Sequence, residues 1–228
     1  IPRNTYDNET LAQIDTFTKV WVSGTHRNFL SISAHQNSEM LVIQFKPMGA
    51  FPFLHCPIQK LNDKVVSANE IFGKEILKLR DDILLTESPQ SKFELVANWL
   101  LERNKRKKEA PDYLLTFTER LQKEPLSNLK NIVDSYPASQ KQLIEHFKKY
   151  VGLTPKYYHR ILRFNEILKM INQKEKLSWT DIAYSCDYSD QSHFIKEFFL
   201  FSGFNPQEFL KMEFTKERTN FFPMDRKG

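Results

Sequence analysis

Apolar residues in the second half of the chain recur every three or four positions, which is the period of an amphipathic helix. The pattern runs from about residue 111 to residue 212. Within it, residues 156–171 have apolar positions such as Tyr158, Ile161 and Leu168 on one face. They predict one long amphipathic helix with shorter helices on either side.

This helical pattern is an internal repeat. Each copy reads as a short helix, a tight break and a second helix with one apolar stripe, which is the plan of a helix-turn-helix unit. We place the two units at about residues 127–150 and 178–201, joined by the long helix. The matched positions are Ile132 with Ile182, 50 residues apart, and, 51 residues apart, Leu143 with Phe194, Phe147 with Phe198, Gly152 with Gly203 and Pro155 with Pro206.

Serines stand where each short helix would begin. We expect Ser127 or Ser178 to cap the first helix of its unit, and Ser139 or Ser189 to cap the second. We expect Gly152 and Gly203 to end the second helices in a left-handed conformation.

The first half has a different pattern, with short runs of apolar and β-branched residues separated by turn residues. Residues 16–22, 29–35 and 39–45 predict strands. Three strands make a poor sheet, so we expect further strands upstream or a partner that covers the edge. Residues 68–79 and 91–106 predict helices, the second capped by Ser91, and Pro111 indicates a domain boundary.

The positive charge of the chain lies in its second half. Residues 1–100 hold 10 basic and 11 acidic side chains, whereas residues 101–228 hold 23 and 17, a net charge of +6. A basic module of this kind has the electrostatics to approach a polyanion. The basic stretch 103–108 is either a phosphate-binding arm or the solvated end of a helix, and the dipole of the helix favours the second interpretation.

Other classes of protein find little support in the sequence. No apolar run approaches the roughly 20 residues of a membrane span, and Cys56 and Cys186 lack the spacing of a metal or redox motif. We expect two reduced thiols in a cytoplasmic protein. The histidines follow no defensible metal-ligand spacing, and we expect no metal, no cofactor and no catalytic residue; His146 and His159 read as surface residues.

Two stretches resemble the DNA-binding domain of AraC/XylS-family transcription regulators of bacteria. They are Val151–Phe164, which is similar to the end of the first unit in that family, and Asp181–Pro206, which is similar to its C-terminal signature. Less firmly, Val42–Gly49 and Leu61–Val66 resemble the cupin-like domain of a poorly described subgroup. The family has glycine in the turn of each unit, where this chain has Pro137 and Asp187. Because proline cannot adopt a left-handed conformation, the first turn must differ locally.

The resemblance and the helical geometry imply the same DNA-facing positions. On the first recognition helix Glu145 stands where the family often has arginine, which puts base reading by this unit in doubt. The alternative is that both faces are only solvated. The DNA-binding candidates are Gln140, Lys141, Ile144, Glu145 and Lys148 in the first unit and Gln191, Ser192, Ile195 and Lys196 in the second.

We therefore predict an α+β protein. A small β-rich, partly cupin-like sensor domain with C-terminal helices (1–110) precedes an all-α DNA-binding domain of two helix-turn-helix units (111–228). The expected partners are double-stranded DNA, RNA polymerase and a second copy bound through the N-terminal half, with no membrane and with the small-molecule effector unknown. The rival hypotheses are a DNA-binding adaptor controlled by protein contacts alone and, further behind, a cupin-type enzyme.

Overall fold

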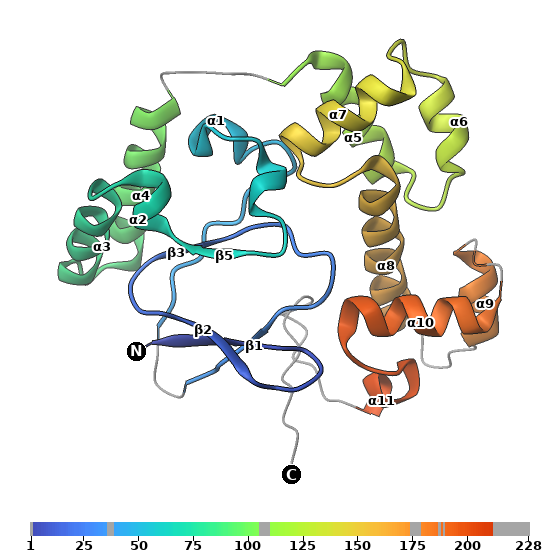
Figure 1. Ribbon diagram of the computed structural model, residues 1–228, viewed down its shortest axis with the longest axis horizontal. Helices are drawn as coiled ribbons and strands as arrows, with labels where there is room; N and C mark the ends of the chain where they lie inside the picture. The colour runs from blue at the N-terminus through green and yellow to red at the C-terminus, as the bar shows by residue number, and fades with distance from the viewer. Residues whose placement is uncertain are drawn as a thin grey trace.

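The computed structural model describes residues 2–35, 39–104, 110–173, 179–186, 188 and 190–211. These residues form a small N-terminal region of short strands and helices, followed by a region built of helices alone (Figure 1). The predicted α+β class is confirmed.

The strands of the N-terminal region belong to two separate antiparallel pieces. β1 (Arg3–Tyr6) lies between β2 (Gln13–Phe17) and β4 (Ser31–Ile32) in a three-stranded sheet. β3 (Trp21–Ser23) pairs with β5 (Val65–Ser67) in a two-stranded ribbon. The described strands form an open sheet and a ribbon and do not close into a barrel. The cupin-like description of this region therefore stays a prediction.

The strand predictions are wrong in several places. Residues 39–45 form no strand, and Val42 in this segment is 59% exposed. The predicted strand 16–22 is divided between β2 and β3, only two residues of 29–35 are paired, and β1 was not predicted. A β-branched run becomes a strand only when a neighbouring strand supplies its hydrogen bonds and its packing, and periodicity cannot identify that neighbour.

Five helical segments complete the N-terminal region: α1 (Phe51–Leu54), the 3-10 helix η1 (Ile58–Leu61), α2 (Ala68–Phe72), α3 (Glu75–Leu85) and α4 (Pro89–Arg103). The predicted helix 68–79 is broken at Gly73, whose φ of 70° lies in the left-handed region. α4 begins earlier than predicted and is capped by Ser88 rather than Ser91. Of the basic stretch 103–108, residues 105–108 lie outside the described residues, so neither interpretation of the stretch is tested.

In the C-terminal region, the described residues form two three-helix units followed by one short helix. The helices are α5 (Asp112–Lys123), α6 (Leu129–Asp134), α7 (Gln140–Tyr150), α8 (Pro155–Gln173), α9 (Trp179–Ser185), α10 (Gln191–Ser202) and α11 (Pro206–Lys211). Figure 1 shows α7 at one end of the long α8 and α10 across its other end. The predicted helix-turn-helix units joined by a long helix are confirmed.

Each unit has its own apolar core, and the second core lies almost entirely within α8 to α11, with Leu126 packed against it. Phe194 and Phe198 of α10 pack with residues of α8 and α9. In the first unit, Phe147 of α7 lies in a cluster that also contains Phe51 of α1 and Ile58 of η1. The N-terminal region thus completes the core of the first unit, although Pro111 directly precedes α5. The domain boundary at Pro111 stays a prediction.

Among the described residues, no helix combines the length and the apolarity that crossing a bilayer requires.

Replacing Phe198 with alanine should destabilise the protein by about 3–5 kcal/mol, because its ring is only 1% exposed and fills the second core. Phe199→Ala is the matched control, since the neighbouring ring is 51% exposed, and should cost less than about 1 kcal/mol. Chemical denaturation of the two variants measures both values. Equal losses would mean that the buried face of α10 is assigned wrongly.

Candidate nucleic-acid interface

The first helix-turn-helix unit presents α7 on a short connection from α6. Asn128, not Ser127, caps α6 by accepting a hydrogen bond from the backbone N–H of Lys130 at 2.9 Å. Ser139 caps α7 as predicted, accepting from the N–H of Gln142 at 3.2 Å. The connection at residues 135–139, which includes Pro137, contains no residue with a positive φ. The turn therefore differs from a glycine turn, as the proline requires.

The second unit presents α10 in the same way. Its cap is Asp190 rather than Ser189, and the carboxylate accepts a hydrogen bond from the N–H of His193 at 2.8 Å. A carboxylate at this position also suits the positive end of the helix dipole. The predicted cap Ser178, the turn residue Asp187 and Ser189 lie outside the described residues. Gly203 ends α10 with a φ of 78°, as predicted.

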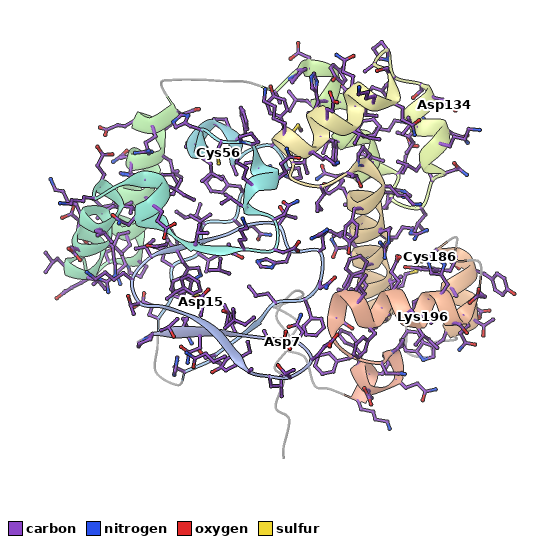
Figure 2. All side chains as sticks on the ribbon, in the orientation of Figure 1. Asp7, Asp15, Cys56, Asp134, Cys186 and Lys196 are labelled. Atoms are coloured by element: carbon purple, nitrogen blue, oxygen red, sulfur yellow. The ribbon has the colours of Figure 1, made fainter. Side chains whose placement is uncertain are left out.

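The predicted interface residues lie on the outer faces of α7 and α10. The exposed ones are Gln140, Lys141, Glu145 and Lys148 on α7 and Gln191, Ser192 and Lys196 on α10. Figure 2 labels Lys196 on α10. Ile144 and Ile195 are half-buried, and Ile195 packs against the second core. Each recognition helix therefore offers a mainly polar outer face with one partly available isoleucine.

The structure adds three residues that the sequence analysis missed. Phe199 is exposed on α10, three residues after Lys196, and stands 51 residues after Lys148 of the first unit. The repeat itself could have identified it. Lys130 and Lys156 line a shallow groove beside Gln140. They belong to different helices, so no periodic signal connects them.

A buried carboxylate ties the second recognition helix to its surroundings. Glu197 of α10 is only 2% exposed. It accepts hydrogen bonds from Nε of Arg160 at 2.6 Å, from an Nη of Arg163 at 3.1 Å and from the hydroxyl of Tyr188 at 2.8 Å. The two arginines belong to α8, and Tyr188 lies in the connection between α9 and α10. One side chain thus fixes α10 against both neighbours.

Hydrogen bonding and charge decide the ionisation of this cluster. Burial alone would raise the pKa of Glu197, but the hydrogen bonds from Tyr188 and Arg160 and the charges of Arg160 and Arg163 outweigh burial and hold the pKa below its usual value. Burial and the neighbouring carboxylate raise the pKa of Tyr188. The hydroxyl of Tyr188 therefore stays protonated and donates a hydrogen bond to Glu197.

The first unit has a polar contact at the equivalent positions. The hydroxyl of Tyr113 in α5 is hydrogen-bonded to Nδ1 of His146 in α7. Tyr113 stands 50 residues before Arg163, and His146 stands 51 residues before Glu197, which are the two offsets of the repeat. The same pair of positions joins the recognition helix to the first helix of its unit in both cases, through a tyrosine–histidine hydrogen bond in the first unit and an ion pair in the second.

Two histidines expected at the surface are not fully exposed. His159 in α8 is 7% exposed, and His146 is half-buried beside Tyr113. The prediction for His159 is wrong: its side chain is buried in α8, which packs against α5, α7 and α10. Within the described ranges, no group of three or more His, Cys, Asp or Glu side chains is arranged to hold a metal ion.

Comparisons with known proteins agree with this geometry. Residues 133–212 match a family described as a helix-turn-helix domain, and residues 3–67 match a domain of unknown function. The chain is 32% identical over 81 residues to the HTH-type transcriptional activator RhaS of Shigella boydii serotype 18, which covers 36% of this chain and 29% of the relative. It is 36% identical over 67 residues to RhaS of Escherichia coli O9:H4, covering 29% and 24%. The match thus spans less than a third of the length of these relatives.

Glu197→Gln should destabilise the protein by roughly 2–4 kcal/mol at neutral pH, because it leaves two partly buried arginines without a counter-charge. Glu166→Gln is the control. Glu166 lies on α8 and pairs with Lys169, which is 65% exposed. Loss of the Glu166 charge should therefore cost less than about 1 kcal/mol.

The loss should also depend on pH. Because the pKa of Glu197 is lowered in the folded protein, its stabilising contribution is present above the usual value of 4.5 and disappears as the pH falls through the lowered pKa. Denaturation curves at several pH values should therefore show the parent and Glu197→Gln converging in acid. A difference that persists or grows in acid would show that the carboxylate is not ionised in the folded state.

Proposed function

We propose that this chain, which carries an AraC-type helix-turn-helix domain in its C-terminal half, is a sequence-specific regulator of transcription. In this proposal α7 and α10 are recognition helices that enter two adjacent major grooves of double-stranded DNA. The regulator acts on the chromosome in the cytoplasm of a bacterium.

The repeat of exposed, capped helices on a common rod carries the proposal. α7 and α10 each bury one aromatic stripe, turn a mainly polar face outward and pack against α8. One such face would be an ordinary solvated helix. Two at equivalent positions of a repeat, in a region with a net charge of +6, suit two grooves of one duplex.

The second unit has the chemistry of the principal reader. Gln191 can pair with adenine through two hydrogen bonds, and Lys196 can reach guanine or a phosphate. Ser192 can contact either a base or a phosphate. Phe199 and the exposed part of Ile195 add apolar surface that suits the methyl group of thymine. No acidic side chain lies among these residues, since Asp190 is occupied as the helix cap.

The first unit has a different balance of charge. Glu145 is exposed in the middle of its outer face, between Lys141 and Lys148. A carboxylate close to a row of phosphates lowers affinity unless a cytosine amino group receives it. We therefore assign most of the specific affinity to the second unit, and a selective role at cytosine to the first.

The relatives support activation as the mode of regulation, because those proteins are named transcriptional activators. An activator of this kind acts on RNA polymerase, which is the protein partner we propose. The proposed binding to DNA does not depend on RNA polymerase.

We further propose a homodimer formed through the N-terminal half. On α4, Phe93 is 59% and Leu101 is 65% exposed, and exposed Ala97 lies between them at helical spacing. Leu84 and Leu85 at the end of α3 are also exposed. An apolar stripe of this kind on a helix is typical of a surface that pairs with another helix.

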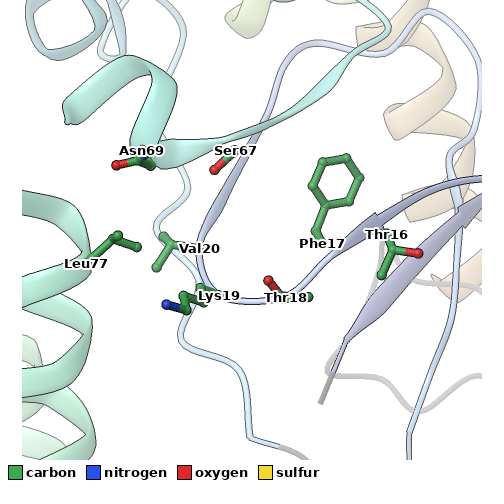
Figure 3. A pocket seen from close by; sticks show the side chains of 8 residues that line it. All are labelled: Thr16, Phe17, Thr18, Lys19, Val20, Ser67, Asn69 and Leu77. Carbon is green, nitrogen blue, oxygen red and sulfur yellow. The ribbon is translucent and has the colours of Figure 1, made fainter. Parts of the chain in front are cut away.

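A second candidate function is a DNA-binding adaptor that responds to protein contacts rather than to a small molecule. A depression of about 260 Å³ lies between β2 and α3. Figure 3 shows residues that line it, among them Lys19, Ser67 and Asn69. Small-molecule sites are usually cavities of about 300–1,000 Å³ that enclose most of the ligand. The depression is smaller than that range, which favours control by a protein contact over a small molecule.

The DNA-binding proposal predicts a steep loss of affinity with salt and unequal effects of three variants. Gln191→Ala and Lys196→Ala should weaken binding to a selected duplex by about 1–3 kcal/mol if they contact base edges. If Lys196 binds a phosphate instead, the slope of log K against log salt should fall by about 0.9. Glu145→Ala should leave affinity unchanged or raise it. Binding curves against selected and scrambled duplexes measure all three.

Lys78→Ala is the control for charge alone, because Lys78 is exposed on α3, far along the chain from both units. It should change neither affinity nor salt slope. An affinity of the parent for DNA that does not change with salt concentration would contradict the proposal. A greater loss from Glu145→Ala than from Lys196→Ala would make the first unit the principal reader.

The dimer proposal predicts that Leu101→Glu yields monomers. The new carboxylate would be buried without a partner at the interface, whereas Lys74→Glu, an exposed change on the connection before α3, should leave dimers intact. Native mass spectrometry of the full chain gives the oligomeric state and, in the same spectrum, any retained small molecule. A monomeric parent would contradict the dimer, and a stoichiometric small molecule would contradict the adaptor.

A further inference from the structure

The two recognition helices end in equivalent glycine turns, and the N-terminal half contacts both. Gly152 follows α7 with a φ of 98°, and Gly203 follows α10 with a φ of 78°. These glycines stand 51 residues apart, at the offset of the repeat. Figure 1 shows α7 and α10 both extending toward the N-terminal half.

The turn after α7 is held by polar contacts. Nδ2 of Asn62 donates a hydrogen bond to the carbonyl oxygen of Gly152, and the hydroxyl of Thr25 donates to the carbonyl of Val151 at 3.5 Å. A Cβ atom on Gly152 would lie only 2.8 Å from Oδ1 of Asn62 and 3.0 Å from Cγ2 of Ile58. The absence of a side chain at Gly152 is what permits this close approach.

The turn after α10 is held by an aromatic ring. A Cβ atom on Gly203 would lie 3.0 Å from the nearest atom of the Phe29 ring. The N–H of Phe29 also donates to the carbonyl oxygen of Leu200 at 3.4 Å. Phe29 thus covers the second glycine turn, as Asn62 covers the first.

The residues that make these contacts form one connected structure, which we call the brace: residues 25–29 together with Asn62 and Asp63. Asp63 accepts hydrogen bonds from the backbone N–H of Arg27 at 2.7 Å and from Nε of Arg27 at 2.6 Å. The carbonyl oxygen of Arg27 accepts from the hydroxyl of Tyr157, at the start of α8, at 2.6 Å. The brace therefore contacts both turns and the rod between them.

A single helix such as α8 fixes the distance between two units but leaves bending and twisting about its axis as its softest motions. A second connection between the far ends of α7 and α10 opposes both motions. We propose that the brace sets the relative position of the two recognition helices, and that Phe29 and Asn62 are positioning residues that restrict the protein to one spacing of DNA half-sites. This inference rests on the proposed DNA binding.

The inference is tested with the full-length chain and a duplex selected from a random pool by the parent protein. One base pair inserted between the two half-sites moves them about 3.4 Å apart and rotates one by about a tenth of a turn. The parent should lose about tenfold or more in affinity, and the double variant Phe29→Ala, Asn62→Ala should lose about threefold or less. Lys78→Ala, exposed on α3 and outside both the brace and the α4 stripe, is the control and should behave like the parent. An equal spacing penalty in the parent and the double variant would overturn the brace.

A second measurement separates the brace from DNA binding. Spin labels at Lys141→Cys and Lys196→Cys, with Cys56 and Cys186 replaced by serine, report the distance between the two recognition helices without DNA. The distance distribution should be narrow in the otherwise unchanged chain and broader when Phe29 and Asn62 are alanine. An unchanged distance distribution would overturn the brace. A broadened distribution, together with no affinity of the unlabelled parent for any duplex, would retain the brace and reject only the DNA-binding proposal. If the double variant does not fold, Asn62→Ala alone takes its place in both measurements.

Discussion

A charge that cannot be buried alone organises the helical half of this protein. Glu197 lies inside the second unit, and an unpaired carboxylate there would cost several kcal/mol of solvation. Its partners come from α8 and from the connection before α10, so α10 has one orientation in which every hydrogen bond is made. Apolar packing is not directional, and the Phe198 stripe alone would tolerate a rotation or a shift of the helix. The carboxylate removes that freedom, because charge-assisted hydrogen bonds require a defined geometry.

The two units hold their recognition helices in place with different side chains. Tyr113 and His146 occupy the positions of Arg163 and Glu197, but their hydrogen bond restrains α7 less strongly than the charge-assisted hydrogen bonds of Glu197 restrain α10. The first unit also obtains part of its core from Phe51 and neighbouring residues of the N-terminal region. The core of the first unit therefore depends on residues of the N-terminal region, whereas the N-terminal region contacts the second unit only at the end of α10, through Phe29, among the contacts described above.

Sequence periodicity predicts what a helix buries but not what it is buried against. The Phe147 and Phe198 stripes, the helix ends at Gly152 and Gly203 and the cap at Ser139 follow from local pattern, and the structure agrees with them. The predicted strand at residues 39–45 failed because a strand needs a partner elsewhere in the chain. Burial of His159 and the role of Glu197 were missed for the same reason, since both depend on contacts between helices. At the candidate interface, the pattern predicted the outer faces of α7 and α10, whereas Lys130 and Lys156 come from other helices and carry no periodic signal.

The hollow at Gly203 also limits how this protein can change over evolutionary time. The space beside Gly203 is filled by the ring of Phe29, which lies more than 170 residues earlier in the chain. A methyl group at position 203 would be strained by its backbone conformation and would displace Phe29. A smaller residue at position 29 would leave this space empty. The two positions can therefore change only together. A hybrid gene that joins this N-terminal half to the helical half of a relative would lose the fit unless the relative offers the same hollow.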